Sequence, residues 1–413
     1  MAHVNRRIGK SSETANTTPD GTGGGVLDAF IYDYFNRSGN VPTSPGAAPQ
    51  GISATGGVIS DFASSGIVYR AHIFTSAGDF NVTSIGGLGD TVDALLVGGG
   101  GGGGNYGGGG GGGAVVHVEG KPISTGPNTV VIASGGVGAI PKQQSVPVPS
   151  ARDGGSTTFL GYTATGGGGA GGYDDQPARG GANGGGQGAY LTSGVAGTAP
   201  TQPSPLSPYS TVYAGNTGGV HGASSPPYGY YPSGGGAGAG GDGNSVPAPS
   251  NPEGNGGAGG VGKQINIIPS PPSINSGNGY HWAGGGGGSV YNALYGNGGA
   301  GGIGGGGGGG DSGAGGGSAL NAGQDGPSGG GAGGQSTGGG GGGASYVPNG
   351  GHTAANGGSG VVIVRYQIGT VQTGDAKATG GAISFYGGKT IHTFTGSGTF
   401  ATTSDWTSAT VEY

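Results

Sequence analysis

Unbroken runs of glycine constrain this chain more than any other feature, because a residue without a side chain contributes nothing to an apolar core. Glycine supplies 118 of the 413 residues, roughly four times its ordinary share. The runs fall between residues 98 and 360, at 98–104, 107–113, 166–169, 284–288, 304–310 and 338–343. The interior of this region must therefore be held together by something other than side-chain burial.

Three arrangements are open to such runs. A flexible linker leaves the glycines unordered, since ordering the backbone of one residue costs ~1–2 kcal/mol. A collagen triple helix needs glycine strictly at every third position, and the long consecutive runs exclude it. In a bundle of polyglycine II helices, with three residues per turn, the backbone N–H and C=O groups point sideways and bond to neighbouring helices.

The position of the runs favours the bundle over the linker. Flexible linkers mix glycine with serine and separate domains. These runs instead begin directly after LLV at 95–97 and end just before VVIVRY at 361–366. We therefore expect a mainly β fold with a polyglycine II bundle inserted at 98–360, almost no helix, and a flexible linker as the alternative.

Strands are predicted on both sides of the glycine runs, from apolar and β-branched segments bounded by turn residues. The run VVIVRYQI at 361–368 is uninterrupted, which is typical of a strand buried on both faces. The other predicted strands lie at 56–62, 67–84 with a hairpin turn at 76–79, 91–97, 114–120, 129–136 and 156–167.

The N-terminal segment, residues 1–54, is predicted to hold one short amphipathic α-helix at 26–37, followed by a linker. Apolar side chains recur there at helical spacing, at Leu27, Phe30, Ile31, Tyr34 and Phe35. A lone helix of about ten residues is unstable in water, so we expect this stripe to mediate attachment or self-association. The basic start has no hydrophobic region after it, so no signal peptide is predicted, and no apolar stretch is long enough to span a bilayer.

An internal repeat divides the rest of the chain. HIFTSAGDFNVTS at 72–84 matches HTFTGSGTFATTS at 392–404, and TGGVIS at 55–60 matches TGGAIS at 379–384. We expect a β domain with its inserted bundle at 55–372 and the start of a second copy of this module at 373–413. Because TVEY at 410–413 aligns with TVDA at 91–94, we also expect a second glycine-rich module to follow.

Several classes of function have no support in the sequence. There is no Cys, and the seven His residues are spread without metal-ligand spacing. The net charge of −6 gives no footprint for nucleic acid. A chain with so much glycine matches nucleotide-binding patterns by chance, and no acid/base pair stands out. We expect a protein that is not an enzyme and needs no cofactor or metal.

The aromatic segments between glycine runs are the best binding candidates. Tyr and Trp offer rigid amphipathic surface that suits sugars or protein loops. The alternative is that these rings cover the ends of the glycine bundle and shield its backbone from water, and different rings can serve either purpose. The candidates are Tyr209, Tyr213, Tyr228, Tyr230, Tyr231, Tyr280, Trp282, Tyr291 and Tyr295.

The order HIFTSAGDFNVTS, TVDALLVGGGGGGG, STTFLGYTATGGGGAGG and NGGSGVVIVRY resembles a glycine-rich domain family of phage tail-fibre and other virion structural proteins. The glycine-rich core is also similar to that of the distal adhesin on T-even-type tail fibres. The resemblance implies a homotrimeric virion protein attached to tail or capsid proteins, with loops that bind a host glycan or outer-membrane protein. An extracellular glycine-rich structural or ice-binding protein is the alternative.

Overall fold

A computed structural model describes 15 stretches of the protein: residues 51–141, 151–172, 176–188, 207–221, 232–246, 254–269, 279–290, 296–317, 319, 321–345, 352–370, 378–380, 382–386, 389–394 and 396–402. The chain divides into a main unit, Gly51–Thr370, and a second unit made of Met1–Gln50 and Val371–Tyr413. The helix predicted at 26–37 lies outside the described residues.

The main unit is built on a six-stranded antiparallel sheet, and the mainly β prediction is confirmed. The single helical element in the described residues is a 3-10 turn, η1 (Ser207–Tyr209). The strands of the sheet run in the order β10 (Ser210–Tyr213), β6 (Val115–Pro122), β5 (Thr91–Val97), β13 (Val361–Thr370), β3 (Ile67–Phe74) and β2 (Val58–Ser64).

A second, three-stranded sheet packs on one face of the first. Its order is β1 (Ser53–Thr55), β4 (Gly78–Ser84) and β7 (Gly126–Val130), and the hairpin of β8 (Thr157–Phe159) and β9 (Tyr162–Ala164) lies beside it. The first core, between the sheets, contains Phe80, Val82 and Phe159 from the second layer and Leu96 and Val364 from the first. Alternation of side chains along each strand sends these residues to one face.

The opposite face of the six-stranded sheet carries a second core. Leu95 and Ile363 pack there against the hairpin of β11 (Lys263–Gln264) and β12 (His281–Trp282). β13 lies between β5 and β3 and contributes to both cores. Its first four residues, 361–364, are fully buried, as the β-branched run predicts.

Two predicted strands have different bounds in the structure. The segment predicted at 129–136 pairs as β7 only to Val130, because its glycines join the glycine-rich region, where Gly136 donates to Gly100 O (2.8 Å). The segment at 156–167 forms the hairpin β8–β9, because Leu160 and Gly161 adopt positive φ and reverse the chain.

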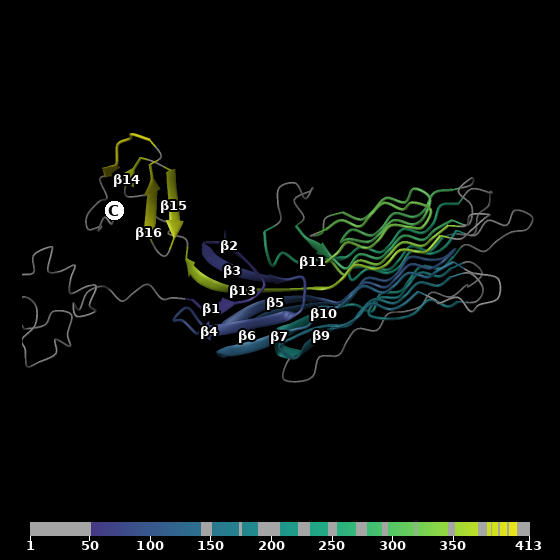
Figure 1. Cartoon of the computed structure of the whole chain (residues 1–413), viewed down its shortest axis with the longest axis horizontal. Coiled ribbons are helices and arrows are strands. Elements are labelled where there is room, and N and C mark those ends of the chain that lie inside the picture. Colours follow the sequence, from purple (N-terminus) through teal and green to yellow (C-terminus); the bar gives the residue numbers. More distant parts are fainter. Residues whose placement is uncertain are drawn as a thin grey trace, which may run out of the picture. The chain divides into compact units, whose positions relative to one another are not determined.

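The glycine-rich segments of the main unit run side by side away from the sheets as extended chains that are not strands (Figure 1). Their hydrogen bonds leave each chain in several directions with a period of three residues. In 98–104, the N–H groups of every third residue bond to one neighbour, so successive donors reach 108–114, 151–155 and 354–358 in turn. The carbonyl groups accept from three further segments, 136–139, 167–170 and 341–344.

Residues in this region approach too closely for side chains. A Cβ added to Gly101 would overlap the carbonyl oxygen of Gly168, and the same overlap with a neighbouring carbonyl recurs along the whole run 98–104. Backbone hydrogen bonds therefore replace side-chain packing as the interior of this part of the protein.

The second unit contains two small antiparallel pairs among its described residues. β14 (Ala378–Thr379) pairs with β17 (Ala401–Thr402), and β15 (Ala382–Tyr386) pairs with β16 (Lys389–Thr393).

Candidate functional site

The glycine-rich segments of the main unit run away from the sheets to an end that we call the distal end (Figure 1). The first run turns there at Asn105 and Tyr106. Asn105 donates from Nδ2 to Ile140 O (2.9 Å) and pairs with Ala344 in an isolated parallel β-bridge. Ser289 donates from Oγ to Gly107 O (3.0 Å). Segments from four distant parts of the sequence thus meet at this end.

Several connections between glycine-rich segments start and finish near the distal end. The described chain stops and resumes there at residues 141 and 151, 172 and 176, 221 and 232, 246 and 254, 290 and 296, and 345 and 352. Five predicted aromatic site residues belong to these connections and lie outside the described residues: Tyr228, Tyr230, Tyr231, Tyr291 and Tyr295. The fold therefore brings the anchoring points of separate aromatic segments together.

Buried polar side chains take the place of glycine near the distal end. These buried residues come from six different segments: Asn105, Gln187, His221, Ser233, Ser289 and Ser345. Two of them donate to the backbone of a neighbouring segment, Asn105 to Ile140 O and Ser289 to Gly107 O. Buried polar groups from six segments therefore lie near the points where the described chain stops and resumes.

The other four predicted aromatic residues lie at the sheet end of the main unit. Tyr209 directly precedes β10, and Tyr213 is the last residue of β10. Both lie at the sheet edge and are half-buried. Lys121 Nζ lies 4.9 Å from the ring centroid of Tyr209, and Lys263 Nζ lies 4.3 Å from that of Tyr213. These cation–π contacts hold the two rings at the edge while leaving part of each exposed.

Tyr280 and Trp282 are buried, with exposures of 5% and 0%. Their ring centroids lie 5.6 Å apart, and Trp282 Nε1 donates to Ile265 O (3.1 Å). Burial raises the pKa of the Tyr280 hydroxyl. In this structure both rings fill the second core, close to the point where the glycine-rich segments leave the sheet, so they act in packing rather than at the surface.

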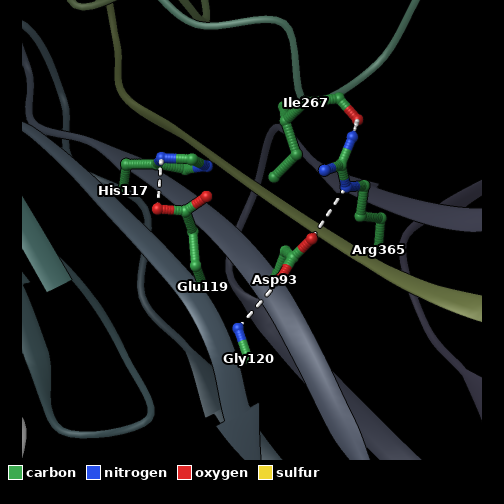
Figure 2. A network of polar contacts seen from close by, with 6 residues as sticks. All are labelled: Asp93, His117, Glu119, Gly120, Ile267 and Arg365. Atoms are coloured by element: carbon green, nitrogen blue, oxygen red, sulfur yellow. Dashed lines mark hydrogen bonds and ion pairs between the residues drawn. The ribbon is translucent and has the colours of Figure 1, made fainter. Parts of the chain in front are cut away.

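A charged cluster that the sequence reasoning missed lies on the second-core face, beside the segment that follows β11 (Figure 2). Arg365 on β13 pairs with Asp93 on β5 (Nε to Oδ2, 3.0 Å) and donates from Nη1 to Ile267 O (3.1 Å). Asp93 Oδ1 accepts the N–H of Gly120 (2.9 Å), a residue with φ of 61° at a bulge in β6. The pair therefore joins three strands and the covering segment.

His117 and Glu119 border the charged cluster from β6, with Nδ1 and Oε2 3.8 Å apart (Figure 2). Burial lowers the pKa of His117, although the nearby carboxylates of Glu119 and Asp93 act in the opposite direction. Burial thus favours the neutral form of the imidazole beside Glu119.

Aromatic rings extend this cluster toward the sheet edge. The Arg365 guanidinium lies 4.8 Å from the centroid of Tyr69, which stacks on Phe62 at 5.7 Å and 25°. Each of β5 and β13 carries a single charged residue among apolar neighbours. That isolated Asp and Arg were the available sequence signal, but their pairing across 272 positions required the fold.

The described residues contain neither a metal-binding cluster nor a membrane-spanning helix. Nowhere in that part of the chain do three or more His, Cys, Asp or Glu side chains gather in a way that could hold a metal ion. Nor does any helix of the described ranges have the length and apolar character needed to cross a bilayer.

The chain belongs to a family of glycine-rich domains, whose family model matches residues 75–367. This match runs from the end of β3 through the glycine-rich segments to β13, and so covers most of the main unit. A search of curated proteins finds no match.

Proposed function

We propose that the glycine-rich segments form a polyglycine II bundle and that the protein is a non-enzymatic fibre or adhesin of a virion. The three-residue period of the hydrogen bonds around 98–104 supports the bundle, because a helix with three residues per turn directs its groups in three directions. The absence of room for Cβ atoms along the same run supports it independently.

The observation that carries the functional proposal is the convergence of connecting segments on the distal end. A rod held by many cooperative hydrogen bonds is stiff, although each bond contributes only about 0.5–1.5 kcal/mol. Loops anchored side by side at the end of a stiff rod form a composite surface at a fixed distance from its base. That arrangement suits a protein that binds another surface at a distance from its own base.

The distal connections contain tyrosines that suit binding to such a surface. Tyr228, Tyr230, Tyr231, Tyr291 and Tyr295 belong to these connections. Tyrosine contributes a large rigid contact area at low entropic cost. We assign these residues to contact with a host surface receptor, either a glycan or an outer-membrane protein. Tyr209 and Tyr213 at the sheet end are secondary candidates.

The remaining parts of the proposal concern assembly. The apolar stripe at 26–37 would attach the N-terminus to other tail or capsid proteins and would associate three chains into a homotrimer. An antibody against residues 1–50 is expected to label the particle at the base of a fibre. Absence of label from intact particles that contain this protein would contradict the virion assignment.

Receptor binding is tested with the purified full chain, fluorescently labelled, on a panel of bacterial cells and a glycan array. Replacing Tyr228, Tyr230 and Tyr231 together by Ser is expected to reduce binding at least tenfold, whereas Tyr209→Ser at the sheet end is expected to leave most of it. Equal binding by both variants would refute the distal assignment. Thermal hysteresis without cell binding would favour the ice-binding alternative.

A further inference from the structure

The second unit repeats the local geometry of the first four strands of the main unit. β15 pairs with β16 so that Ile383 opposes His392, as Ile59 opposes His72 between β2 and β3. The short pairs correspond as well, since β14 meets β17 in the register in which β1 meets β4. The hairpin of the second copy is four residues shorter, which leaves the pairing near the histidine unchanged.

The histidine at the centre of each copy has the same environment on one side. Nδ1 of His72 donates to Gly56 O (2.6 Å), and Nδ1 of His392 donates to Gly380 O (2.7 Å). Both glycines have φ of 107°. In each copy the histidine ring meets a phenylalanine edge-on at 5.0 Å between centroids, and the angles between the planes are 79° and 87°.

On its other side, the histidine of the first copy, His72, contacts Tyr366 of β13. Tyr366 lies with its hydroxyl 2.9 Å from His72 Nε2 and its ring 5.6 Å from the imidazole. Because Nδ1 carries the proton that binds Gly56, Nε2 accepts the hydrogen bond from Tyr366. β13 also pairs along the full length of β3, from Phe74 to Ile67.

The second copy has the same apolar residues without the same cover. Phe74 and Phe80 are 4% and 0% exposed in the first copy, whereas Phe394 and Phe400 are each 39% exposed in the second. Ile391 on β16 is 40% exposed. In the described part of the second unit, β16 belongs to a two-stranded sheet with β15. Its counterpart β3, in contrast, is an interior strand of the six-stranded sheet.

We infer that the second copy is a docking site for a β-strand with the chemistry of β13, supplied from outside the main unit. The incoming strand would carry a β-branched run followed by a tyrosine and would add antiparallel to β16. By the register of the first copy, a residue equivalent to Val364 would oppose His392. The tyrosine two positions further would then reach His392 Nε2.

Strand addition suits this site for two physical reasons. In the described residues β15 is the one strand that pairs with β16, and an edge strand of this kind adds a further strand through its backbone groups. The exposed Phe394 and Ile391 would be buried by the incoming β-branched side chains, as their counterparts are in the first copy. The chemistry of the partner strand is taken from the first copy, where β13 pairs with β3 and its Tyr366 contacts His72.

The inference is tested with a labelled synthetic peptide of residues 360–370, GVVIVRYQIGT, extended by two N-terminal lysines for solubility, and the full-length protein. Saturable binding measured by fluorescence anisotropy is expected. A peptide with the equivalent of Tyr366→Phe should bind roughly fivefold more weakly, the effect of one hydrogen bond of about 1 kcal/mol. A scrambled peptide with the same lysines should not bind.

The His392→Ala variant locates the binding event. The His392→Ala protein should bind the native peptide about as weakly as the wild-type protein binds the peptide with Phe in place of Tyr366. It should bind these two peptides equally well, because the histidine and the tyrosine form one contact. Absence of binding, or equal binding by scrambled peptide and by His392→Ala protein, would overturn the inference. Self-association of the full chain that His392→Ala abolishes but the peptide does not inhibit would also overturn it, because the occupant would then not be a strand like β13.

Discussion

Replacing Gly101 by Ala tests the central physical claim, that backbone groups packed without side chains form the interior. Gly101 donates to Gly111 O (2.8 Å) and accepts from Gly341 N (2.9 Å), while Gly111 donates to Gly168 O (2.8 Å). The added methyl group would overlap that same carbonyl of Gly168. The segments must therefore move apart, and the three hydrogen bonds are weakened together.

The expected cost follows from these bonds. Three buried hydrogen bonds at about 0.5–1.5 kcal/mol each, with some polar groups left unpaired, give a loss of about 2–5 kcal/mol in the free energy of unfolding. The matched control is Gly317→Ala, because a Cβ there meets nothing within 4 Å and φ lies outside the left-handed region. Its effect should be near zero or stabilising by about 0.4–1 kcal/mol, through the lower entropy of the unfolded chain.

Urea unfolding of both variants, with hydrogen exchange of residues 98–113 measured by mass spectrometry, is the appropriate assay. Gly101→Ala should lower the midpoint and accelerate exchange across this segment, whereas Gly317→Ala should do neither. If the two variants unfold alike, or if the amides of 98–113 exchange in the wild type as fast as in an unfolded peptide, the reasoning is refuted.

Five further outcomes are expected. Trp282→Ala should destabilise the main unit by about 3–5 kcal/mol in urea unfolding, since it empties a fully buried site. Burial lowers the pKa of His72 below 6.5, so the unfolded chain binds more protons and the melting temperature should fall as pH drops below about 6.5; His72→Gln should flatten this dependence. Burial raises the pKa of Tyr366 to about 12, so stability should also decline above about pH 10, and an unchanged melting temperature there would contradict this. Arg365→Gln should cost about 1–2 kcal/mol by leaving Asp93 without its partner, an effect that Asp93→Asn in the same chain should partly reverse. Light scattering of the full chain should give about three times its mass of 38.4 kDa if the trimer proposal is right, and a stable monomer would refute it.

The strands of the main unit were largely predictable because local pattern determines them. The β-branched run at 361–368 predicted a strand buried on both faces, and β13 is that strand. The prediction failed where glycine followed the apolar residues, as at 129–136, because neighbouring glycine-rich chains compete for the same backbone groups. Local pattern contains no information about that competition.

The candidate sites show a similar division. Aromatic residues between glycine runs were recognisable from the sequence, but their separation into buried and connecting groups was not. Trp282 is enclosed by the second core because β11 and β12 fold over one face of the sheet. The Asp93–Arg365 pair joins strands 272 positions apart, so it depends entirely on the placement of β13 beside β5.

The sequence by itself determined that this protein is mainly β, that side chains cannot form the interior of the glycine-rich region, and that the segment around His72 recurs around His392. These properties depend on residue type and spacing alone. Only the tertiary structure decided which segments surround one another, which ends converge, and which copy of the repeat is covered. A bare backbone has the same groups at every residue, so its choice of neighbours is fixed by the sheets and turns that align it.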